Sequence, residues 1–221
     1  MLDLARAGAA EGVAVVAGVQ TAGRGRHGRA WEAPPGAALL ASLLLRTGPA
    51  LPPDRLHPAV AAVALAARDA CVRVAGFRPD LKWPNDLLVG DAKLAGILAE
   101  TEGTAVVVGL GLNVSAAGPW PPGAVSAEEA AGRPVDAGAL LDAVLAGVSA
   151  RRGDWPAVAS EYRRDCATLG RTVRVDLADE TFIGVAADVD DDGRLLVDVG
   201  PCLRTVTAGD VVHLRPSPGP G

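Results

Sequence analysis

The chain of 221 residues is long enough for one large domain, or for a domain of about 150 residues joined to a smaller one. Hydrophobic residues make up 49% of the chain and charged residues 21%, which favours a globular protein over a disordered one. The net charge of −5 argues against a general nucleic-acid-binding protein, and no uninterrupted apolar run is long enough to span a membrane.

The cysteine and histidine residues form no recognisable disulfide or metal pattern. Cys71, Cys166 and Cys202 lie far apart and show no C-x-x-C spacing, which indicates free thiols in a reducing compartment and predicts a cytoplasmic location. His57 and His213 have no acidic or cysteine neighbours at ligand spacing. We therefore assign no metal ligands from the sequence.

The first third of the chain predicts two strands and a long helix around a loop rich in glycine and arginine. A short helix within residues 2–10 precedes a Val-rich strand over 13–19, and the apolar run 38–46 indicates a buried strand. Two prolines and an aspartate at 52–54 mark the start of a helix. Apolar residues then recur at helical spacing to about residue 75, so this helix is expected to bury one face.

The middle of the chain predicts hairpins followed by helices. Residues 80–103 alternate strands with Pro-Asn and Gly-Asp turns, and 104–114 form another buried strand. Residues 115–135 are rich in proline, glycine and alanine and are expected to form a loop. Helices are expected after Asp136, a suitable N-cap residue, and over 155–167.

A change in the sequence pattern near residues 168–170 predicts a domain boundary. From there Val-rich runs alternate with Asp/Gly turns at intervals of roughly 8 to 12 residues, which is typical of a small barrel of short antiparallel strands. We expect a main domain over 1–168, a barrel over 169–216 and a disordered tail over 217–221. The predicted fold class is α+β, with a mixed or antiparallel sheet and helices in the main domain.

Residues 23–28, Gly-Arg-Gly-Arg-His-Gly, fit the G-x-G-x-x-G pattern of dinucleotide-binding turns. That turn requires a helix directly after the glycines and an acidic residue about 20 positions further on. Here a Pro-Pro-Gly sequence follows, and Arg46 stands near the place of the acid. A Walker loop is excluded too, because Gly28 is followed by Arg-Ala rather than Lys-Ser/Thr.

Two interpretations of this arginine loop (residues 23–28) remain. It is either a solvated basic loop without function, or a mobile lid that captures a polyanion. Glycines allow a backbone to approach a ligand closely, and arginines supply forked donors suited to phosphate oxygens. Because the loop joins two apolar strands, we favour the lid.

Two further stretches combine polar and small residues. The segment 82–86, Lys-Trp-Pro-Asn-Asp, is followed by Lys93 and a small pair ending at Gly96, which would permit close approach of a ligand. An ordinary hairpin with surface lysines would explain the same letters. The stretch 109–114, Gly-Leu-Gly-Leu-Asn-Val, indicates by itself only a strand thinned by glycine.

Taken in order, residues 20–46, 81–100 and 106–114 resemble the biotin protein ligase family. The resemblance is strong over about residues 11–114 and extends more loosely to 193–215. It implies a catalytic domain like those of biotin ligases and class II aminoacyl-tRNA synthetases, followed by an SH3-like barrel. It also implies an ATP-dependent enzyme that activates biotin as biotinyl-5′-AMP and transfers it to a lysine of a biotin carboxyl carrier protein domain.

The resemblance also implies roles for individual residues. Lys93 is expected beside the reacting carboxylate and α-phosphate, Arg26 is the key cation of the loop, and Asp86 completes the catalytic set. ATP and biotin would be substrates, with Mg²⁺ neutralising phosphate charge. The implied substrate-binding residues are Gln20, Gly23, Arg24, Gly25, Arg26, Gly28, Trp31, Trp83, Asn85, Lys93, Gly96 and Asn113.

The implied partner is the biotin carboxyl carrier domain of acetyl-CoA carboxylase or another acyl-CoA carboxylase, with no nucleic acid and no membrane. A monomer or weak homodimer is expected, of the two-domain class without a winged-helix DNA-binding domain. Two features depart from the family. A Ser/Thr-Thr-Asn segment before the first helix is missing, which suggests a start codon assigned too late. His27 stands where arginine is more usual, so one lid charge is expected to be lost at neutral pH.

Three alternatives stay open. A lipoate or octanoate ligase or transferase of the same superfamily is the nearest, although the segment 82–86 together with 93–98 favours biotin. Cys71 lies on a predicted helix face, which argues against a cysteine acyltransferase. The second alternative is an inactive, N-terminally truncated homologue that only binds. The third is a nucleic-acid-binding module, which conflicts with the acidic net charge.

Overall fold

The computed structural model describes residues 1–46, 56–207 and 209–214, apart from the side chain of His27. The helix start expected at 52–54, the tail expected at 217–221 and the charge expected to be lost at His27 lie outside these residues.

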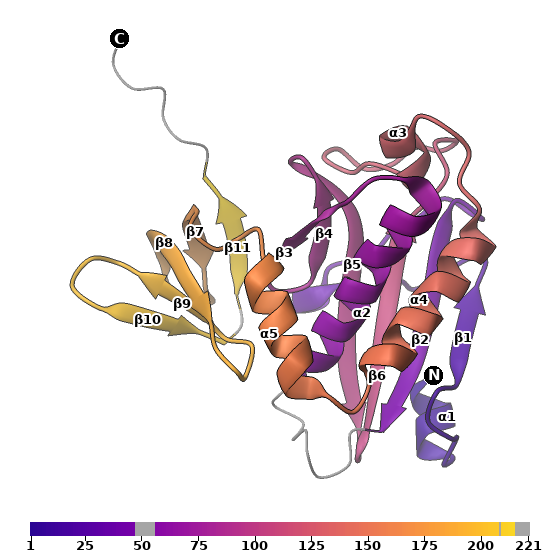
Figure 1. Ribbon diagram of the computed structural model, residues 1–221, viewed down its shortest axis with the longest axis horizontal. Helices are drawn as coiled ribbons and strands as arrows, with labels where there is room; N and C mark the ends of the chain where they lie inside the picture. Colours follow the sequence, from indigo (N-terminus) through magenta and orange to yellow (C-terminus); the bar gives the residue numbers. More distant parts are fainter. Residues whose placement is uncertain (47–55, 208, 215–221) are drawn as a thin grey trace.

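A six-stranded antiparallel sheet forms the framework of the main domain (Figure 1), with the strand order β1-β2-β6-β5-β4-β3. Two neighbouring interior strands, β2 and β6, are runs of leucine, valine and small residues, as expected for strands buried in a sheet. The strands are β1 (Ala14–Ala17), β2 (Ala38–Arg46), β3 (Asp80–Lys82), β4 (Asp86–Val89), β5 (Ala92–Glu102) and β6 (Ala105–Asn113).

Three helices cover one face of this sheet: α2 (His57–Ala70), α4 (Ala137–Arg151) and α5 (Trp155–Asp165) (Figure 1). A π-helical turn, η3 (Cys71–Ala75), continues α2. Alternate residues of β2 and β6 point into the core beneath the helices, because successive side chains of a strand face opposite sides. Helices α2 and α4 pack closely, since a Cβ on Gly147 would lie 2.9 Å from that of Ala66.

The opposite face of the sheet is only partly covered. Helix α1 (Leu2–Arg6) packs over one end of it, where Ala5, Leu44, Ala105 and Val107 form a small second core. The rest of this face carries the pocket described below.

The prediction of a loop throughout 115–135 is wrong. A short helix, α3 (Ala127–Ala131), lies within it. Ser126 Oγ accepts a hydrogen bond from the Glu129 amide (3.3 Å), and Glu129 Oε2 accepts one from the Ser126 amide (2.7 Å). This reciprocal capping box holds a helix that composition alone obscured.

A five-stranded antiparallel sheet, in the order β10-β9-β8-β7-β11, forms the C-terminal part. Its inward residues join the same hydrophobic core as the main sheet. The predicted α+β class with a small C-terminal β domain is confirmed, while the boundary near 168–170 stays a prediction. The strands are β7 (Thr172–Asp176), β8 (Thr181–Val189), β9 (Leu195–Asp198), β10 (Leu203–Val206) and β11 (Asp210–His213).

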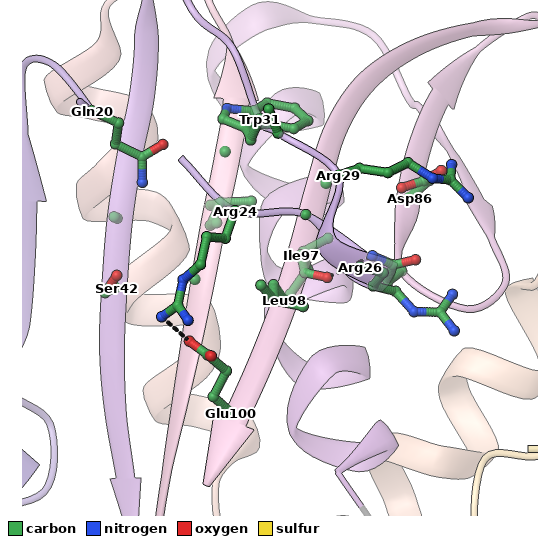
Figure 2. Close-up of a pocket in the computed structure, with 18 of the residues that line it drawn as sticks. Gln20, Arg24, Arg26, Arg29, Trp31, Ser42, Asp86, Ile97, Leu98 and Glu100 are labelled. Atoms are coloured by element: carbon green, nitrogen blue, oxygen red, sulfur yellow. Dashed lines mark hydrogen bonds and ion pairs between the residues drawn. The ribbon is translucent and has the colours of Figure 1, made fainter. Parts of the chain in front are cut away.

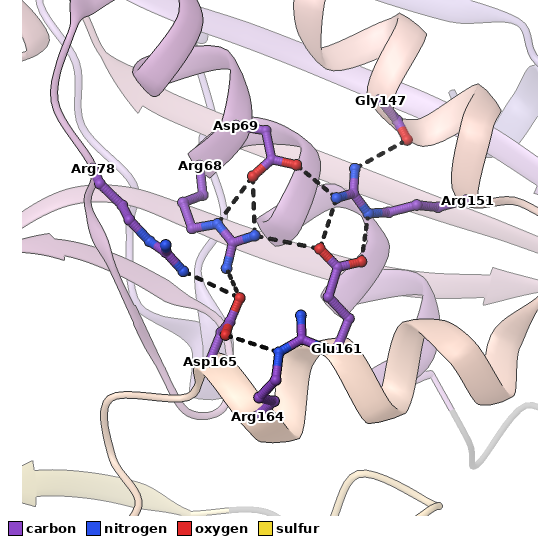
Figure 3. A network of polar contacts seen from close by, with 8 residues as sticks. All are labelled: Arg68, Asp69, Arg78, Gly147, Arg151, Glu161, Arg164 and Asp165. Atoms are coloured by element: carbon purple, nitrogen blue, oxygen red, sulfur yellow. Dashed lines mark hydrogen bonds and ion pairs between the residues drawn. The ribbon is translucent and has the colours of Figure 1, made fainter.

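A network of charges ties the three covering helices together (Figure 3). Arg68 of α2 reaches Asp165 (2.6 Å) and Glu161 (3.3 Å) on α5. Arg151 of α4 binds the same Glu161 at 2.8 Å and Asp69 of α2 at 2.6 Å. The network therefore fixes α5, whose end leads into the C-terminal sheet.

No helix among the described residues is long and apolar enough to cross a bilayer. Cys71, Cys166 and Cys202 are all free thiols, as the sequence predicted, and the first two are buried.

His57 is packed between the two parts of the chain. Its ring meets that of Tyr162 edge-on, with centroids 4.7 Å apart, and a Cβ on Gly193 of the C-terminal part would collide with it. Both ring nitrogens are buried and have no hydrogen-bond partner among the described residues. Burial lowers the pKa of His57 from 6.5 to about 4, so the folded protein holds this imidazole neutral.

We expect His57 to make the protein less stable in mild acid. Because the pKa of His57 is lowered on folding, the stability that depends on the neutral ring is fully present above pH 6.5. It is lost as the pH falls toward 4, since the unfolded chain binds the proton more readily. Between pH 7 and pH 5 the loss is about 2 kcal/mol. Urea unfolding of wild type and His57→Phe at both pH values measures it. An equal loss in the variant would contradict this assignment.

Candidate active site

A pocket of about 330 Å³ lies on the open face of the main sheet (Figure 2). Its floor is made of glycines on adjacent strands. Gly96 of β5 pairs with Gly111 of β6, and Gly109 of β6 pairs with Ser42 of β2. Without side chains at these positions the sheet surface forms a trough, which the residues around it can fill or offer to a ligand.

The arginine loop is part of the connection between β1 and β2. It is compact and lies over this trough. The Trp31 amide donates to the Gly23 carbonyl (3.0 Å), and the Gly25 amide donates to the Arg29 carbonyl (2.7 Å). A single 3-10 turn, Arg26–Gly28, closes the loop. No α-helix follows the glycines; β2 does, which confirms that the G-x-G-x-x-G letters do not form a dinucleotide-binding turn.

The indole of Trp31 lies directly on the glycine floor. A Cβ on Gly111 would lie 2.5 Å from Trp31 Cε2, and one on Gly96 would lie 3.1 Å from Trp31 Cζ3. The Lys93 ammonium lies 5.5 Å from the ring centroid, within cation–π range. Trp31 Nε1 is buried with no hydrogen-bond partner among the described residues, so the pocket contains an unused donor.

Lys93 and Asp86 form an ion pair at the centre of the site, with Nζ and Oδ1 2.6 Å apart. The backbone of Lys93 is held firmly: its amide donates to the Gly123 carbonyl (2.7 Å), and its carbonyl accepts from the Val125 amide (3.0 Å). Asn113 completes this support, because its Nδ2 donates to the Lys93 carbonyl at 3.2 Å. The site lysine therefore projects from a rigid backbone.

Arginines on and next to the loop pair with groups from distant parts of the chain. Arg24 binds Glu100 of β5 at 2.9 Å (Figure 2). Arg26 donates to the Gly209 carbonyl at 3.3 Å, and Arg29 forms an ion pair with Asp210. The C-terminal part thus supplies one wall of the pocket.

Partly buried cations lie around the carboxylate of Asp86. Burial lowers the pKa of Arg26 and of Lys82 from their usual values, while the charge of Asp86 acts in the opposite direction on both. Lys82 is the strand partner of Asp86. Arg24, Arg26, Arg29 and Lys93 outnumber the acidic side chains of the pocket, which suits an anionic ligand.

Most residues predicted for the site do line this pocket. They are Gln20, Arg24, Gly25, Arg26, Trp31, Asn85, Asp86, Lys93 and Gly96. Four others lie outside its lining. Gly23 packs against the Trp31 carbonyl, Gly28 has a φ of +72° at the end of the 3-10 turn, and Asn113 is buried behind Lys93.

Trp83 does not face the large pocket. It is 1% exposed, and its Nε1 donates to the Gly193 carbonyl of the C-terminal part at 2.8 Å. It lines a smaller cavity of about 160 Å³, together with His57 and Asn85. The family resemblance implied substrate binding for Trp83, whereas in this structure it is a buried residue at the junction of the two parts of the chain.

The sequence did not predict several residues that line the pocket. Among them are Ser42, Glu100 and Arg29, which lie in or beside the motifs but belong to no recognisable pattern. Asp210 comes from a strand that only tertiary structure brings to the site. Within the described residues, no three His, Cys, Asp or Glu side chains gather as a metal site.

Comparison with known sequences places this pocket in a family. The profile of the biotin/lipoate A/B protein ligase family matches residues 3–113, and that of the biotin protein ligase C terminal domain matches residues 168–214. The chain belongs to the biotin/lipoate protein ligase family. The first match contains the arginine loop, Asp86, Lys93 and the glycine floor.

Relatives within the ligase family match nearly the whole chain. The biotin–[acetyl-CoA-carboxylase] ligase of Mycobacterium tuberculosis is 40% identical over 214 residues, which cover 93% of this chain and 80% of that protein. The bifunctional ligase/repressor BirA of Bacillus subtilis is 30% identical, over 95% of this chain and 68% of that protein.

A solved ligase structure has the same fold. The biotin protein ligase of Aquifex aeolicus, in complex with biotin and ATP, superposes with a TM-score of 0.79 at 24% identity. The match covers 94% of this chain and 90% of that one. The two sheets and their connection therefore follow the ligase architecture.

Proposed function

We propose that this protein is an ATP-dependent biotin ligase, which activates biotin as biotinyl-5′-AMP and transfers it to a lysine of a biotin carboxyl carrier domain. The supporting observation is the convergence of Lys93, Asp86 and the loop arginines on one glycine-floored pocket. Similarity to named biotin ligases across most of the chain supports the same activity. The chemistry demands charge neutralisation and positioning rather than a strong base.

In the first step the biotin carboxylate attacks the α-phosphorus of ATP. A bond forms between a carboxylate oxygen and phosphorus, and pyrophosphate leaves. Two anions must meet, so we assign Lys93 Nζ to the negative charge on the reacting oxygens, with Asp86 holding the ammonium in place at 2.6 Å. We assign Arg24 and Arg26 to the phosphates and the acyl-adenylate.

In the second step the carrier lysine, as a free amine, attacks the acyl carbon of the mixed anhydride. An amide bond forms, AMP leaves with the bonding electrons, and the proton lost from the amine passes to solvent. Trp31 packs on Gly96 and Gly111, so the floor beside it, at Gly109, would hold biotin close to the sheet. The indole of Trp31, whose donor is unused, would cover the adenylate. Closure of the arginine loop would keep water from the anhydride.

The donor set fits a Mg²⁺ ion that arrives with the nucleotide. Mg²⁺ is usually held by one or two carboxylates together with substrate phosphates, rather than by an all-protein cage. Asp86 is a pocket carboxylate beside Asn85. The Nδ2 of Asn85 donates to the Ile97 carbonyl (2.7 Å), and its amide oxygen has no hydrogen-bond partner in the described part of the chain. Asp86 and Asn85 would hold the ion, and the bound ion would neutralise phosphate charge.

We further propose that the acceptor is the carrier domain of acetyl-CoA carboxylase or another acyl-CoA carboxylase. A cytoplasmic monomer or weak homodimer that binds neither nucleic acid nor membrane is proposed with it. The acidic net charge of −5 supports the absence of nucleic-acid binding.

Paired assays test this function against its rivals. ATP–pyrophosphate exchange is measured with biotin and with lipoate, and transfer of radiolabelled biotin to a purified carrier domain is measured separately. We expect exchange with biotin and labelling of the carrier lysine. Exchange with lipoate alone would favour the lipoate ligase reading, and biotin binding without either reaction would favour an inactive homologue.

Replacing Arg26 should weaken retention of the intermediate. Arg26→Ala removes a charged donor from the lid, and we expect biotinyl-AMP to dissociate at least about ten-fold faster. Dissociation is followed after adenylate formation in the absence of carrier. Arg133→Ala is the matched control, because Arg133 also donates to a backbone carbonyl (Val74, 2.8 Å) but lies outside the pocket. Unchanged dissociation for Arg26→Ala would refute the lid role.

A further inference from the structure

Trp83 joins the C-terminal part of the chain to the active site. Its indole Nε1 donates to the Gly193 carbonyl (2.8 Å), and its backbone amide donates to Thr168 Oγ1 (3.0 Å). Thr168 is fully buried, and its hydroxyl also contacts Nε2 of His213 in β11 at 3.0 Å. Trp83 is therefore bound directly to Gly193 and Thr168, and through Thr168 it is linked to β11.

The Gly193 carbonyl is itself held in place. Gly193 has a φ of +81°, which favours glycine, and any Cβ there would collide with the His57 ring at the start of α2. The turn that carries Gly193 therefore seats directly against His57. The acceptor of the indole hydrogen bond has little freedom to move relative to the main domain.

The segment 82–86 is fixed at both ends but by different parts of the chain. On one side Trp83 is bound to Thr168 and Gly193. On the other, Asn85 exchanges two hydrogen bonds with Ile97 of β5: its carbonyl accepts from the Ile97 amide (2.9 Å), and its Nδ2 donates to the Ile97 carbonyl (2.7 Å). Asp86 follows immediately and presents its carboxylate to Lys93.

We propose that Trp83 is a positioning residue, through which the docked C-terminal sheet sets the placement of Asp86 and hence of the Lys93 ammonium. Trp83 does not line the large pocket, so it acts through Asp86 and not on the substrates. The inference rests on the proposed ligase function, and it gives the C-terminal sheet a part in adenylate formation besides forming a wall of the pocket.

The test is a double-mutant cycle between Trp83→Phe and Asp86→Asn in the full chain. Trp83→Phe keeps a buried aromatic ring but removes the indole N–H together with part of the ring system. We expect kcat for biotin-dependent ATP–pyrophosphate exchange to fall about ten-fold, with KM for biotin within about two-fold, because misplacement affects the reacting geometry more than binding. In the Asp86→Asn background the same substitution should change kcat by less than about two-fold, since its route of action is already lost.

A control variant separates positioning from the simple loss of an indole hydrogen bond. Trp120 Nε1 donates to the Ser115 carbonyl at 2.9 Å, and neither residue lines the pocket. Trp120→Phe should therefore leave kcat unchanged. Rates are normalised to active sites by the burst of biotinyl-AMP, and Thr168→Val serves as a second variant if Trp83→Phe does not fold.

The outcomes distinguish the inference from the function on which it rests. Equal ten-fold losses in the wild-type and Asp86→Asn backgrounds would overturn the positioning role, as would a loss explained wholly by fewer active sites. Failure of the wild-type protein to catalyse exchange would instead refute the proposed ligase activity.

Discussion

Replacing Lys93 with alanine is expected to reduce biotin-dependent ATP–pyrophosphate exchange at least about 1,000-fold. Lys93 is the cation paired with Asp86 on the pocket wall, and its ammonium is the group placed to stabilise charge where the carboxylate meets the α-phosphate. Its loss also removes the ion-pair partner of the Asp86 carboxylate, so the negative charge of that carboxylate is less well compensated and would oppose the approach of the anionic substrates. Exchange is measured at saturating ATP and biotin.

The chain offers a matched control for this prediction, because Lys82 and Lys93 are its two lysines. Lys82 lies next to the same carboxylate as the strand partner of Asp86, but it does not line the pocket. Lys82→Ala should therefore reduce exchange much less than Lys93→Ala. Near-normal exchange by Lys93→Ala would remove this residue from the chemistry, and equal losses in both variants would point to general electrostatics instead of a specific contact.

The local parts of the site could be predicted from the sequence because strands alternate their side chains with a period of two. Gly109 and Gly111 must therefore share a face of β6, and the long apolar runs predicted the buried strands that are β2 and β6. The failed dinucleotide pattern was equally informative, since Pro34 and Pro35 exclude a helix after the arginine loop. The pairing of Gly96 with Gly111 required the sheet register, which no single strand specifies.

Contacts between distant segments could not be predicted in this way. Asp210 meets Arg29, and Gly193 meets Trp83, only because the C-terminal sheet docks on the main domain. Trp83 shows the difficulty clearly: a tryptophan beside charged residues suits a ligand-stacking role as well as a buried junction, and tertiary packing decides between them. Helix α3, by contrast, did leave a local signal, the Ser126–Glu129 capping box, within a composition typical of loops.

Arg68→Ala is expected to lower the free energy of unfolding by about 3 kcal/mol. Its side chain is 7% exposed, and it contacts carboxylates on two helices, among them Asp165 and Glu161 of α5 (Figure 3). Removing one partner of a buried ion pair leaves charges that have been withdrawn from water without compensation. Urea unfolding at pH 7 measures the free energy of unfolding.

Arg164 provides the comparison on the same network. It pairs with Asp165 at 3.3 Å, yet its side chain is 68% exposed, so Arg164→Ala should cost less than about 1 kcal/mol. The contrast tests burial and not charge as the source of stability, because both variants remove one arginine from the same carboxylate. Equal costs for the two would show that the network contributes through net charge, and a cost below about 1 kcal/mol for Arg68→Ala would show that α5 is held by its apolar face alone. Since α5 ends at Asp165, directly before the residues that bind β3, a weakened network should also loosen the junction that carries Trp83.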